Sequence, residues 1–203
     1  MNHRLIIEGG SKGANSKNAQ IRSREGVTEF LTKAGLSGRL PRIILSGPRS
    51  EALKHFCLEV KSNSDGGFIA LLIDSEEPVV DSDQPWVHIQ RFDQFSRPFK
   101  VSDEQLFLMV TCMETWLVAD RDTLKDFFGE DFQPTALPSL TNLETKSRDA
   151  VQQSLGNATR QCKKQYRKGE CSFELLGKAN PAELEKHLPS VQRFVTILRT
   201  RLT

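Results

Sequence analysis

Hydrophobic and polar positions along the chain form short apolar runs that are separated by segments with helical periodicity. The apolar runs occupy residues 4–8, 42–46 and 68–74. Between them, residues 24–34 and 53–60 carry apolar side chains three and four positions apart, which is the spacing of one helix face. The order strand, helix, strand, helix, strand, joined by right-handed crossovers, predicts an α/β fold of Rossmann-like type, with a mainly parallel sheet flanked by helices.

The run at residues 68–74 is the most apolar stretch of the chain. It predicts a central strand that is buried on both faces, as strands of parallel sheets are. The next candidate strand covers residues 105–112. Residues 78–97 are rich in Pro, Asp and Ser, and they predict an irregular flap with a short strand over residues 87–90.

The second half of the chain predicts helices. Apolar side chains recur at helical spacing from Met113 onward, residues 134–138 are typical of a linker, and another helix begins near Ser147. Further helices complete the chain. We therefore expect an α/β core over residues 1–132 and a helical C-terminal extension over residues 133–203 that packs on this core.

Composition and charge narrow the class of protein. The chain has 203 residues, of which 37% are hydrophobic, and a net charge of +2, so a uniformly basic surface that coats nucleic acid is excluded. The longest apolar runs are far shorter than the roughly 20 residues that a membrane-spanning helix needs, and no signal peptide is visible. The four cysteines form no C-x-x-C pair. We expect a cytoplasmic protein that does not associate with membranes and whose cysteines are reduced.

Acidic residues stand where two of the predicted strands end. Glu8 ends the first strand, and the stretch LLIDSEEP at residues 71–78 places Asp74 and Glu76 after the central strand. Because the carboxyl ends of parallel strands meet at one edge of a sheet, we expect these three carboxylates to converge. They would repel one another unless a cation neutralised them, and oxygen ligands favour Mg²⁺ or Mn²⁺. The same pattern is also typical of a strand-end turn that faces solvent.

Cations near this edge suit phosphate binding. Lys12 belongs to a basic loop at residues 9–23, and Arg49 belongs to the turn before the second predicted helix. Farther along the chain, five cations follow the helical steps i, i+3, i+4, i+7 and i+8, with Tyr166 among them as a candidate stacking group. These cations are Arg160, Lys163, Lys164, Arg167 and Lys168. The helix face that they predict would bind a polyanion such as nucleic acid, or would simply face solvent.

Two further acids are candidates for a supporting role. Asp120 interrupts the apolar stripe of the helix that begins at Met113, and a buried aspartate needs a partner or a metal. Glu114 stands in the sequence METW and could orient a metal site from its second coordination shell. A surface glutamate beside a core tryptophan is the simpler interpretation of METW.

The two acidic motifs carry a family resemblance. With IIEGG at residues 6–10 and LLIDSEEP at residues 71–78, the sequence resembles the TOPRIM domain shared by topoisomerases, primases and a group of nucleases. More closely, PRIILSGPRSEALKHFC, CMETWLVADRDTLKDFFG and YRKGECSFELL are similar to a bacterial family of unknown function with a TOPRIM-like core. Members of that family are often encoded beside ATPases of defence systems.

The resemblance implies roles for the strand-end acids. Glu8 would act as general acid or base, and Asp74 and Glu76 would be the Mg²⁺ ligands of the D-x-D motif. In this chain the second acid of that motif is glutamate, and Glu77 follows it. The implied function is a metal-dependent nuclease that cleaves DNA or RNA as the effector of an ATPase-linked antiviral system, with Lys12 and Arg49 binding phosphate.

Two other functions stay open from the sequence. One is a non-catalytic binding module that holds nucleic acid or an ATPase partner through the basic helix. The other is an enzyme that acts on a small phosphorylated molecule, with the loop at residues 9–23 closing as a lid.

Overall fold

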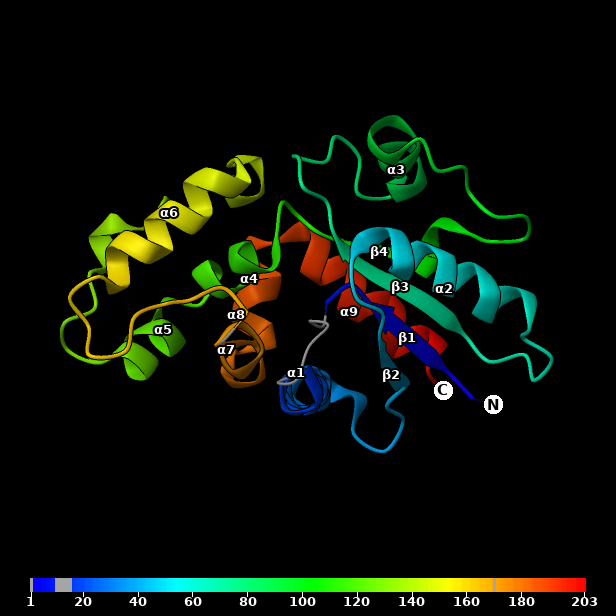
Figure 1. Ribbon diagram of the computed structural model, residues 1–203, viewed down its shortest axis with the longest axis horizontal. Helices are drawn as coiled ribbons and strands as arrows, with labels where there is room; N and C mark the ends of the chain where they lie inside the picture. Colours follow the sequence, from blue (N-terminus) through cyan, green and yellow to red (C-terminus); the bar gives the residue numbers. More distant parts are fainter. Residues whose placement is uncertain (1, 10–15, 170) are drawn as a thin grey trace.

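The computed structural model describes residues 2–9, 16–169 and 171–203. These residues form a four-stranded, fully parallel sheet with the order β2-β1-β3-β4 (Figure 1). The strands are β1 (Arg4–Ile7), β2 (Arg42–Leu45), β3 (Ile69–Asp74) and β4 (Leu106–Met109). The predicted α/β fold of Rossmann-like type, with a parallel sheet flanked by helices, is therefore confirmed.

The alternation of side chains along β3 separates the two faces of the sheet. Ile69, Leu71 and Ile73 pack in the cluster that includes α2 (Arg49–Lys61) and α3 (Pro85–Asp93). Ala70 and Leu72 belong to the larger cluster on the opposite face. The helices that supply this larger cluster are α1 (Ser16–Leu31), α4 (Met113–Ala119), α5 (Arg121–Phe128), α6 (Arg148–Thr159), α7 (Ser172–Lys178), α8 (Pro181–His187) and α9 (Pro189–Arg201).

The first helix is longer than its periodicity predicts. It begins at Ser16 and continues into a π-helical turn, η1 (Thr32–Leu36). Gly26 lies where α1 meets α7, and a Cβ added there would stand 2.0 Å from the carbonyl oxygen of Phe173. Only glycine permits this close approach, which fixes the position of α7 against the core.

Residues 87–90 are helical, so the short strand predicted there is wrong. They lie in the middle of α3, which begins with Pro85. A proline suits the first turn of a helix, because its φ is already helical and its missing N–H would have no intrahelical partner. Trp86 and Ile89, three residues apart, are buried on one face, whereas Val87 is exposed. Alternation over four residues was too short to separate strand from helix.

The helix predicted from Met113 breaks in two at Asp120. The Asp120 carboxylate accepts the backbone N–H of Thr123 at 3.0 Å and its hydroxyl at 2.8 Å, which caps the first turn of α5. It also accepts the backbone N–H of Asn180 at 2.8 Å. The buried acid on the apolar stripe is thus satisfied by the protein itself.

The helix predicted from Ser147 ends earlier than its pattern suggests. α6 stops at Thr159, so the basic residues at positions 160–168 do not lie on a helix face, and that prediction is wrong. The Thr159 hydroxyl donates to the Leu155 carbonyl at 2.9 Å and accepts the backbone N–H of Tyr166 at 3.0 Å. These bonds turn the chain back at Thr159, and five cations without an acid would also repel one another along a helix.

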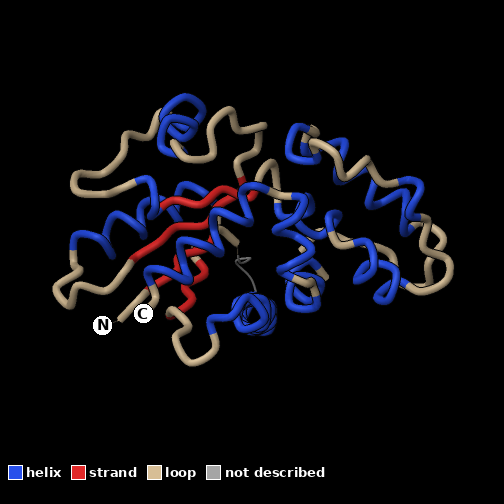
Figure 2. The backbone as a smooth tube through the Cα atoms, turned by 180° about the vertical axis from the view of Figure 1, so that it is seen from behind, coloured by secondary structure: helices blue, strands red, loops and turns tan. Residues whose placement is uncertain are grey.

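Helix α9 joins the two halves of the chain. It crosses one face of the sheet (Figure 2), where the rings of Phe107 and Phe194 meet edge-on with centroids 4.9 Å apart. One apolar cluster includes side chains of the strands and of α9, so it extends across residue 132, where the predicted α/β core ends. Short 3₁₀ turns connect these elements at η2 (Asp103–Gln105), η3 (Pro134–Ala136) and η4 (Leu143–Thr145).

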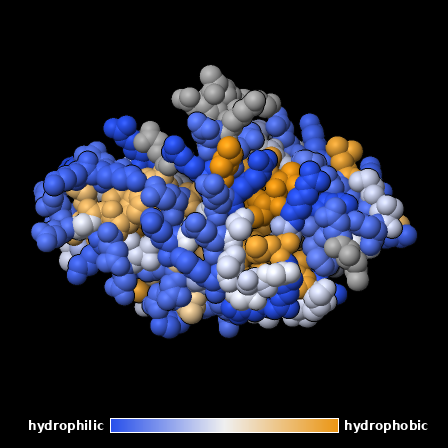
Figure 3. Space-filling model, turned by 90° about the horizontal axis from the view of Figure 1, so that it is seen from below, coloured by the Kyte–Doolittle hydropathy of each residue, from blue (hydrophilic) through white to orange (hydrophobic). Residues whose placement is uncertain are grey.

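Hydrophobic groups also reach the surface, where they form patches bordered by hydrophilic side chains on the face seen in Figure 3. Val80 and Phe99 are among the exposed hydrophobic residues, at 93% and 87%. Within the described ranges, no helix combines the length and the hydrophobicity needed to cross a membrane.

Candidate functional site

Glu8 stands at the carboxyl edge of the sheet, directly after β1. The next residue, Gly9, has a φ of 135° and forms a bridge with Gly47, with N–H to carbonyl distances of 2.8 and 2.9 Å. This glycine pair fixes the loop ends of β1 and β2 side by side. Glu8 Oε2 accepts the backbone N–H of Asp74 at 3.3 Å, so the acid of the first strand reaches the end of the central strand.

Asp74 is the last residue of β3 and lies between the sheet and α4. Its Oδ1 accepts the backbone N–H of Met113, the first residue of α4, at 3.0 Å. Burial, together with the charges of Glu8 and Glu114, raises the pKa of Asp74 to about 7 against the opposing effect of Lys168 and Arg148. The sequence-based expectation that Glu8 and Asp74 lie close together is confirmed.

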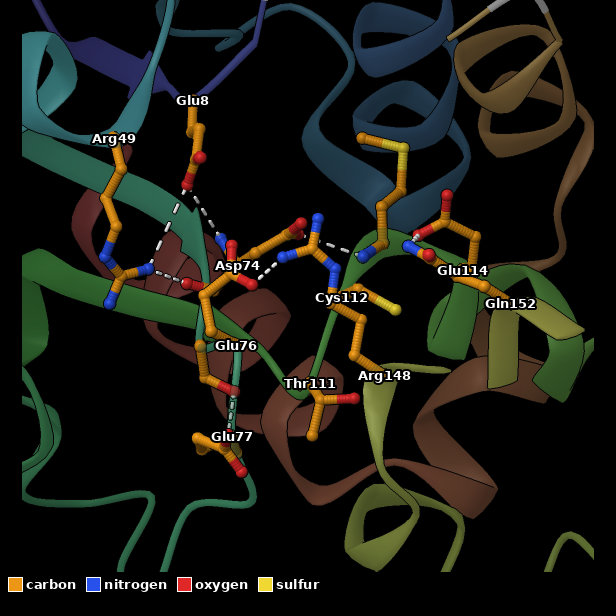
Figure 4. Close-up of polar contacts among 12 residues, drawn as sticks. Glu8, Arg49, Asp74, Glu76, Glu77, Thr111, Cys112, Glu114, Arg148 and Gln152 are labelled. Carbon is orange, nitrogen blue, oxygen red and sulfur yellow. Dashed lines mark hydrogen bonds and ion pairs between the residues drawn. The ribbon is translucent and has the colours of Figure 1, made fainter. Parts of the chain in front are cut away.

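Arg49 stands beside these acids at the start of α2 (Figure 4). Its guanidinium binds the carboxylate of Asp93 through two bonds, of 2.5 and 2.7 Å, and donates to the carbonyl oxygen of Asp74. Arg49 Nη1 is 4.0 Å from Glu8 Oε2. Burial raises the pKa of Glu8, while the charge of Arg49 acts against that rise. The arginine therefore spans the acid pair and α3.

Arg49 also lines a surface pocket of about 400 Å³ at the start of α2. The other residues that line it are Pro48, Ser50, Leu53, Lys54, Asp93 and Phe95. Arg49 therefore contacts the acids at the sheet edge and also lines this pocket.

Glu76 does not join the other two acids as expected. Its backbone adopts a left-handed conformation, with a φ of 67°, and its N–H donates to the Thr111 carbonyl at 2.8 Å. The Glu76 carboxylate forms an ion pair with Arg148 at the first position of α6 (Figure 4). Glu77 contributes its backbone carbonyl to the turn, where it accepts the Ser75 hydroxyl at 2.6 Å.

Cations from the helical part of the chain face the acids. Arg148 and Lys168 both act to lower the pKa of Glu8 and of Asp74, so their charges lie close to this edge. Lys164 instead pairs with Glu174 at 3.2 Å and covers the ring of Phe127. Arg160, Lys163 and Arg167 are exposed on the same irregular segment. Lys12 lies outside the described residues, so its predicted place at this edge stays a prediction.

Glu114 is buried behind Asp74, at 1% exposure. The Tyr166 hydroxyl donates to its Oε1 at 2.7 Å, and the side-chain amide of Gln152 donates to its Oε2 at 3.3 Å. Its charge acts together with burial to raise the pKa of the Cys112 thiol to about 12. Glu114 is therefore not a surface glutamate, and its negative charge acts on the end of β3. Asp120, in contrast, serves as the cap of α5.

Two members of the site escaped the sequence-based reasoning. Arg148 carries no motif, and only the packing of α6 brings it to Glu76. Asp93 was hidden in the flap that the composition predicted, and it binds Arg49 because α3 folds over the end of β3. Neither ion pair could be predicted from the sequence, because its two partners are brought together only by the tertiary structure.

The arrangement can hold a hard cation with few protein ligands. Across residues 2–9, 16–169 and 171–203, no group of three or more His, Cys, Asp or Glu side chains has the geometry to bind a metal. Mg²⁺, however, commonly uses one or two carboxylates and retains several waters. Glu8 and Asp74 are the two carboxylates of this edge that would serve in this way, because a bound cation would offset the cost that raises the pKa of each. Glu76 cannot serve as a metal ligand while its carboxylate is paired with Arg148.

A family model covers nearly the whole chain, over residues 17–199. The chain belongs to the family described as a domain of unknown function, DUF4276. No curated protein and no solved structure matches the chain.

Proposed function

We propose that this member of DUF4276 is a divalent-metal-dependent nuclease that cleaves phosphodiester bonds in DNA or RNA. One observation carries the proposal. Two acids, Glu8 and Asp74, lie together at the carboxyl edge of a parallel sheet, where Glu8 Oε2 accepts the backbone N–H of Asp74, and the charges of Arg49, Arg148 and Lys168 act on this edge. Two acids whose pKa values are raised by burial, bordered by cations, suit a hard metal ion and the phosphate oxygens of a substrate.

Each residue has a separate role in the proposal. Glu8 and Asp74 would hold Mg²⁺ or Mn²⁺, and the metal would supply Lewis-acid activation of a phosphate oxygen and of water. Glu8 would also accept or deliver the proton at its Oε atoms. Arg49 holds the backbone of Asp74 in place and offers positive charge to a phosphate, and Lys12 would add a second cation from its loop.

The roles of Glu76 and of the partners rest on the resemblance to TOPRIM domains and to their defence-linked relatives. Under that resemblance Glu76 is a second metal ligand, which requires that its ion pair with Arg148 opens. The same resemblance supports an ATPase partner and a role in antiphage defence. Nucleic acid is the partner that the cations around the acids favour.

The test is cleavage by the purified protein with Mg²⁺ or Mn²⁺. Single-stranded DNA, duplex DNA and RNA are supplied in turn, with and without the neighbouring ATPase. Asp74→Asn is expected to abolish cleavage, because it removes charge from the acid pair but keeps the shape of the side chain. Asp122→Asn, at an exposed position of α5, is the matched control and should cleave normally. Equal cleavage by wild type and Asp74→Asn would refute the nuclease.

A second function, from a different class, is a binding module without catalysis. Specific pairs favour it, because Glu76 is already matched by Arg148, and Arg49 is matched by Asp93. A binding module predicts that neither Mg²⁺ nor Mn²⁺ changes the melting temperature and that nucleic-acid binding weakens with salt. A metal-dependent rise in the melting temperature that Asp74→Asn abolishes would decide against it.

A further inference from the structure

The basic segment, residues 160–168, leaves α6 and runs as an irregular chain toward the acids. All five of its lysines and arginines are exposed. Its first part is closed into a loop, because the backbone N–H of Tyr166 donates to Thr159 Oγ1 at 3.0 Å and the Gln165 side chain donates to the Arg160 carbonyl at 2.8 Å. The segment therefore has a defined shape even though it is neither helix nor strand.

One side chain of the basic segment turns inward. The Tyr166 hydroxyl donates to the buried carboxylate of Glu114 at 2.7 Å and lies 2.8 Å from the hydroxyl of Ser172. Ser172 Oγ in turn accepts the backbone N–H of Gly169 at 3.1 Å. Burial and the charge of Glu114 raise the pKa of Tyr166, so the hydroxyl keeps the proton that it donates. The network ties both Tyr166 and Gly169 to the core around α4.

Arg167 and Lys168 lie between these two anchored positions. Glu114, to which Tyr166 is bonded, follows Met113, whose backbone N–H donates to Asp74 Oδ1 at 3.0 Å, so the anchored segment lies beside the acid at the end of β3. The charge of Lys168 also acts on Glu8 and on Asp74. A strand of nucleic acid would be repelled by those carboxylates, so it needs cations at fixed positions to approach them. The hydrogen bond from Tyr166 to Glu114 would hold the cations of the basic segment at such fixed positions.

We infer that the hydrogen bond between Tyr166 and Glu114 is a positioning device, which holds the basic segment beside the carboxylates so that its cations bind the phosphates of a nucleic-acid strand. This inference rests on the proposed function for its substrate class. Tyr166 and Glu114 are then positioning residues, because they act through the cations of the segment and touch no substrate.

The test compares Tyr166→Phe with wild type. The variant keeps the ring and loses only the hydroxyl. Thr123→Val is the matched control, because it also removes a hydroxyl that bonds a carboxylate, at 2.8 Å from Asp120, but leaves the basic segment untouched. Binding of a fluorescent single-stranded oligonucleotide is measured without metal, from about 50 to about 400 mM KCl. Trypsin cleavage within the basic segment is followed in parallel on the free proteins.

The anchor predicts two changes in Tyr166→Phe. Trypsin should cut the basic segment several-fold faster than in wild type, because its cations are no longer held in place. Oligonucleotide affinity should fall by about tenfold at low salt with a shallower salt dependence, which corresponds to the loss of one or two phosphate contacts. Thr123→Val should match wild type in both measurements.

Each other outcome overturns part of the reasoning. If binding by Tyr166→Phe equals wild type, or if wild type binds no oligonucleotide, the inference is wrong whatever the trypsin result. If Tyr166→Phe binds weakly but wild type cleaves nothing with either metal, the nuclease proposal fails and the anchored binding surface stands. Where cleavage is present, the variant should raise KM and leave kcat unchanged.

Discussion

Replacing Asp74 with asparagine should make the protein more stable at neutral and alkaline pH while removing its proposed activity. The pKa of Asp74 rises from its ordinary value of 3.8 to about 7 in the folded protein. Its Oδ1 accepts one backbone N–H, from Met113, and an asparagine amide oxygen can accept the same bond. The substitution therefore removes the unfavourable charge with little change in packing.

The sign of the effect follows from proton binding. Between about pH 4 and pH 7 the folded protein holds a proton on Asp74 that the unfolded chain has lost. The free energy of unfolding therefore falls as the pH rises, by up to about 1.4 kcal/mol per pH unit. Below this window the carboxyl is neutral in both states and costs nothing. Above it the full cost is present, about 4 kcal/mol from the raised pKa.

Urea denaturation at a series of pH values measures this cost, in buffer that contains a chelator. The difference in unfolding free energy between Asp74→Asn and wild type should be near zero at about pH 4 and grow through neutrality to several kcal/mol. Asp122→Asn, at its exposed position, should follow the wild-type curve. If the Asp74→Asn and wild-type curves run parallel across the whole range, the charge of Asp74 is not disfavoured in the fold, and the argument for a cation site loses its basis.

Three further substitutions test the packing and the acid turn. Gly26→Ala should lower the melting temperature by the equivalent of about 1–3 kcal/mol, because the new Cβ meets the Phe173 carbonyl. Gly156→Ala, inside α6 with open space around it, should instead stabilise the protein by up to about 1 kcal/mol. Equal effects of the two substitutions would contradict the close packing of α1 on α7. Asp120→Ala should cost about 1–2 kcal/mol in urea denaturation through the lost cap and leave metal binding unchanged, and a loss of metal binding would restore its candidacy for the site. Arg148→Met should change the free energy of unfolding by less than about 1 kcal/mol and should strengthen Mn²⁺ binding in calorimetry, because it frees the Glu76 carboxylate. Unchanged Mn²⁺ binding would exclude Glu76 as a ligand.

The strands and the acids at their ends were accessible to sequence-based reasoning because both depend on local order. Short apolar runs that end in turn residues defined β1, β2 and β3, and parallel pairing placed their carboxyl ends on one edge. Glu8 and Asp74 had to be neighbours once those strands paired. Ile7 lies opposite Leu72, so Glu8 is level with Ile73, and its carboxylate reaches one position farther to the backbone N–H of Asp74.

Helix boundaries were less accessible, because tertiary contacts override periodicity. The apolar spacing continued past Thr159, but its hydroxyl and the inward turn of Tyr166 ended α6 there. In the same way, the cap formed by Asp120 divided a continuous apolar stripe into α4 and α5. Both breaks depend on partners that lie far away in the sequence, such as Glu114 and Asn180.

The sequence by itself determined an α/β fold with two acids at the carboxyl edge of a parallel sheet, because strand pairing follows from short-range hydrophobic order. Only the tertiary structure decided how those acids are charged and matched. It raised the pKa of Asp74 through burial and through Glu114, turned Glu76 toward Arg148, and brought Lys168 to the edge on an irregular segment. Burial and charge act through space, and their effects depend on segments that the order of residues does not bring together.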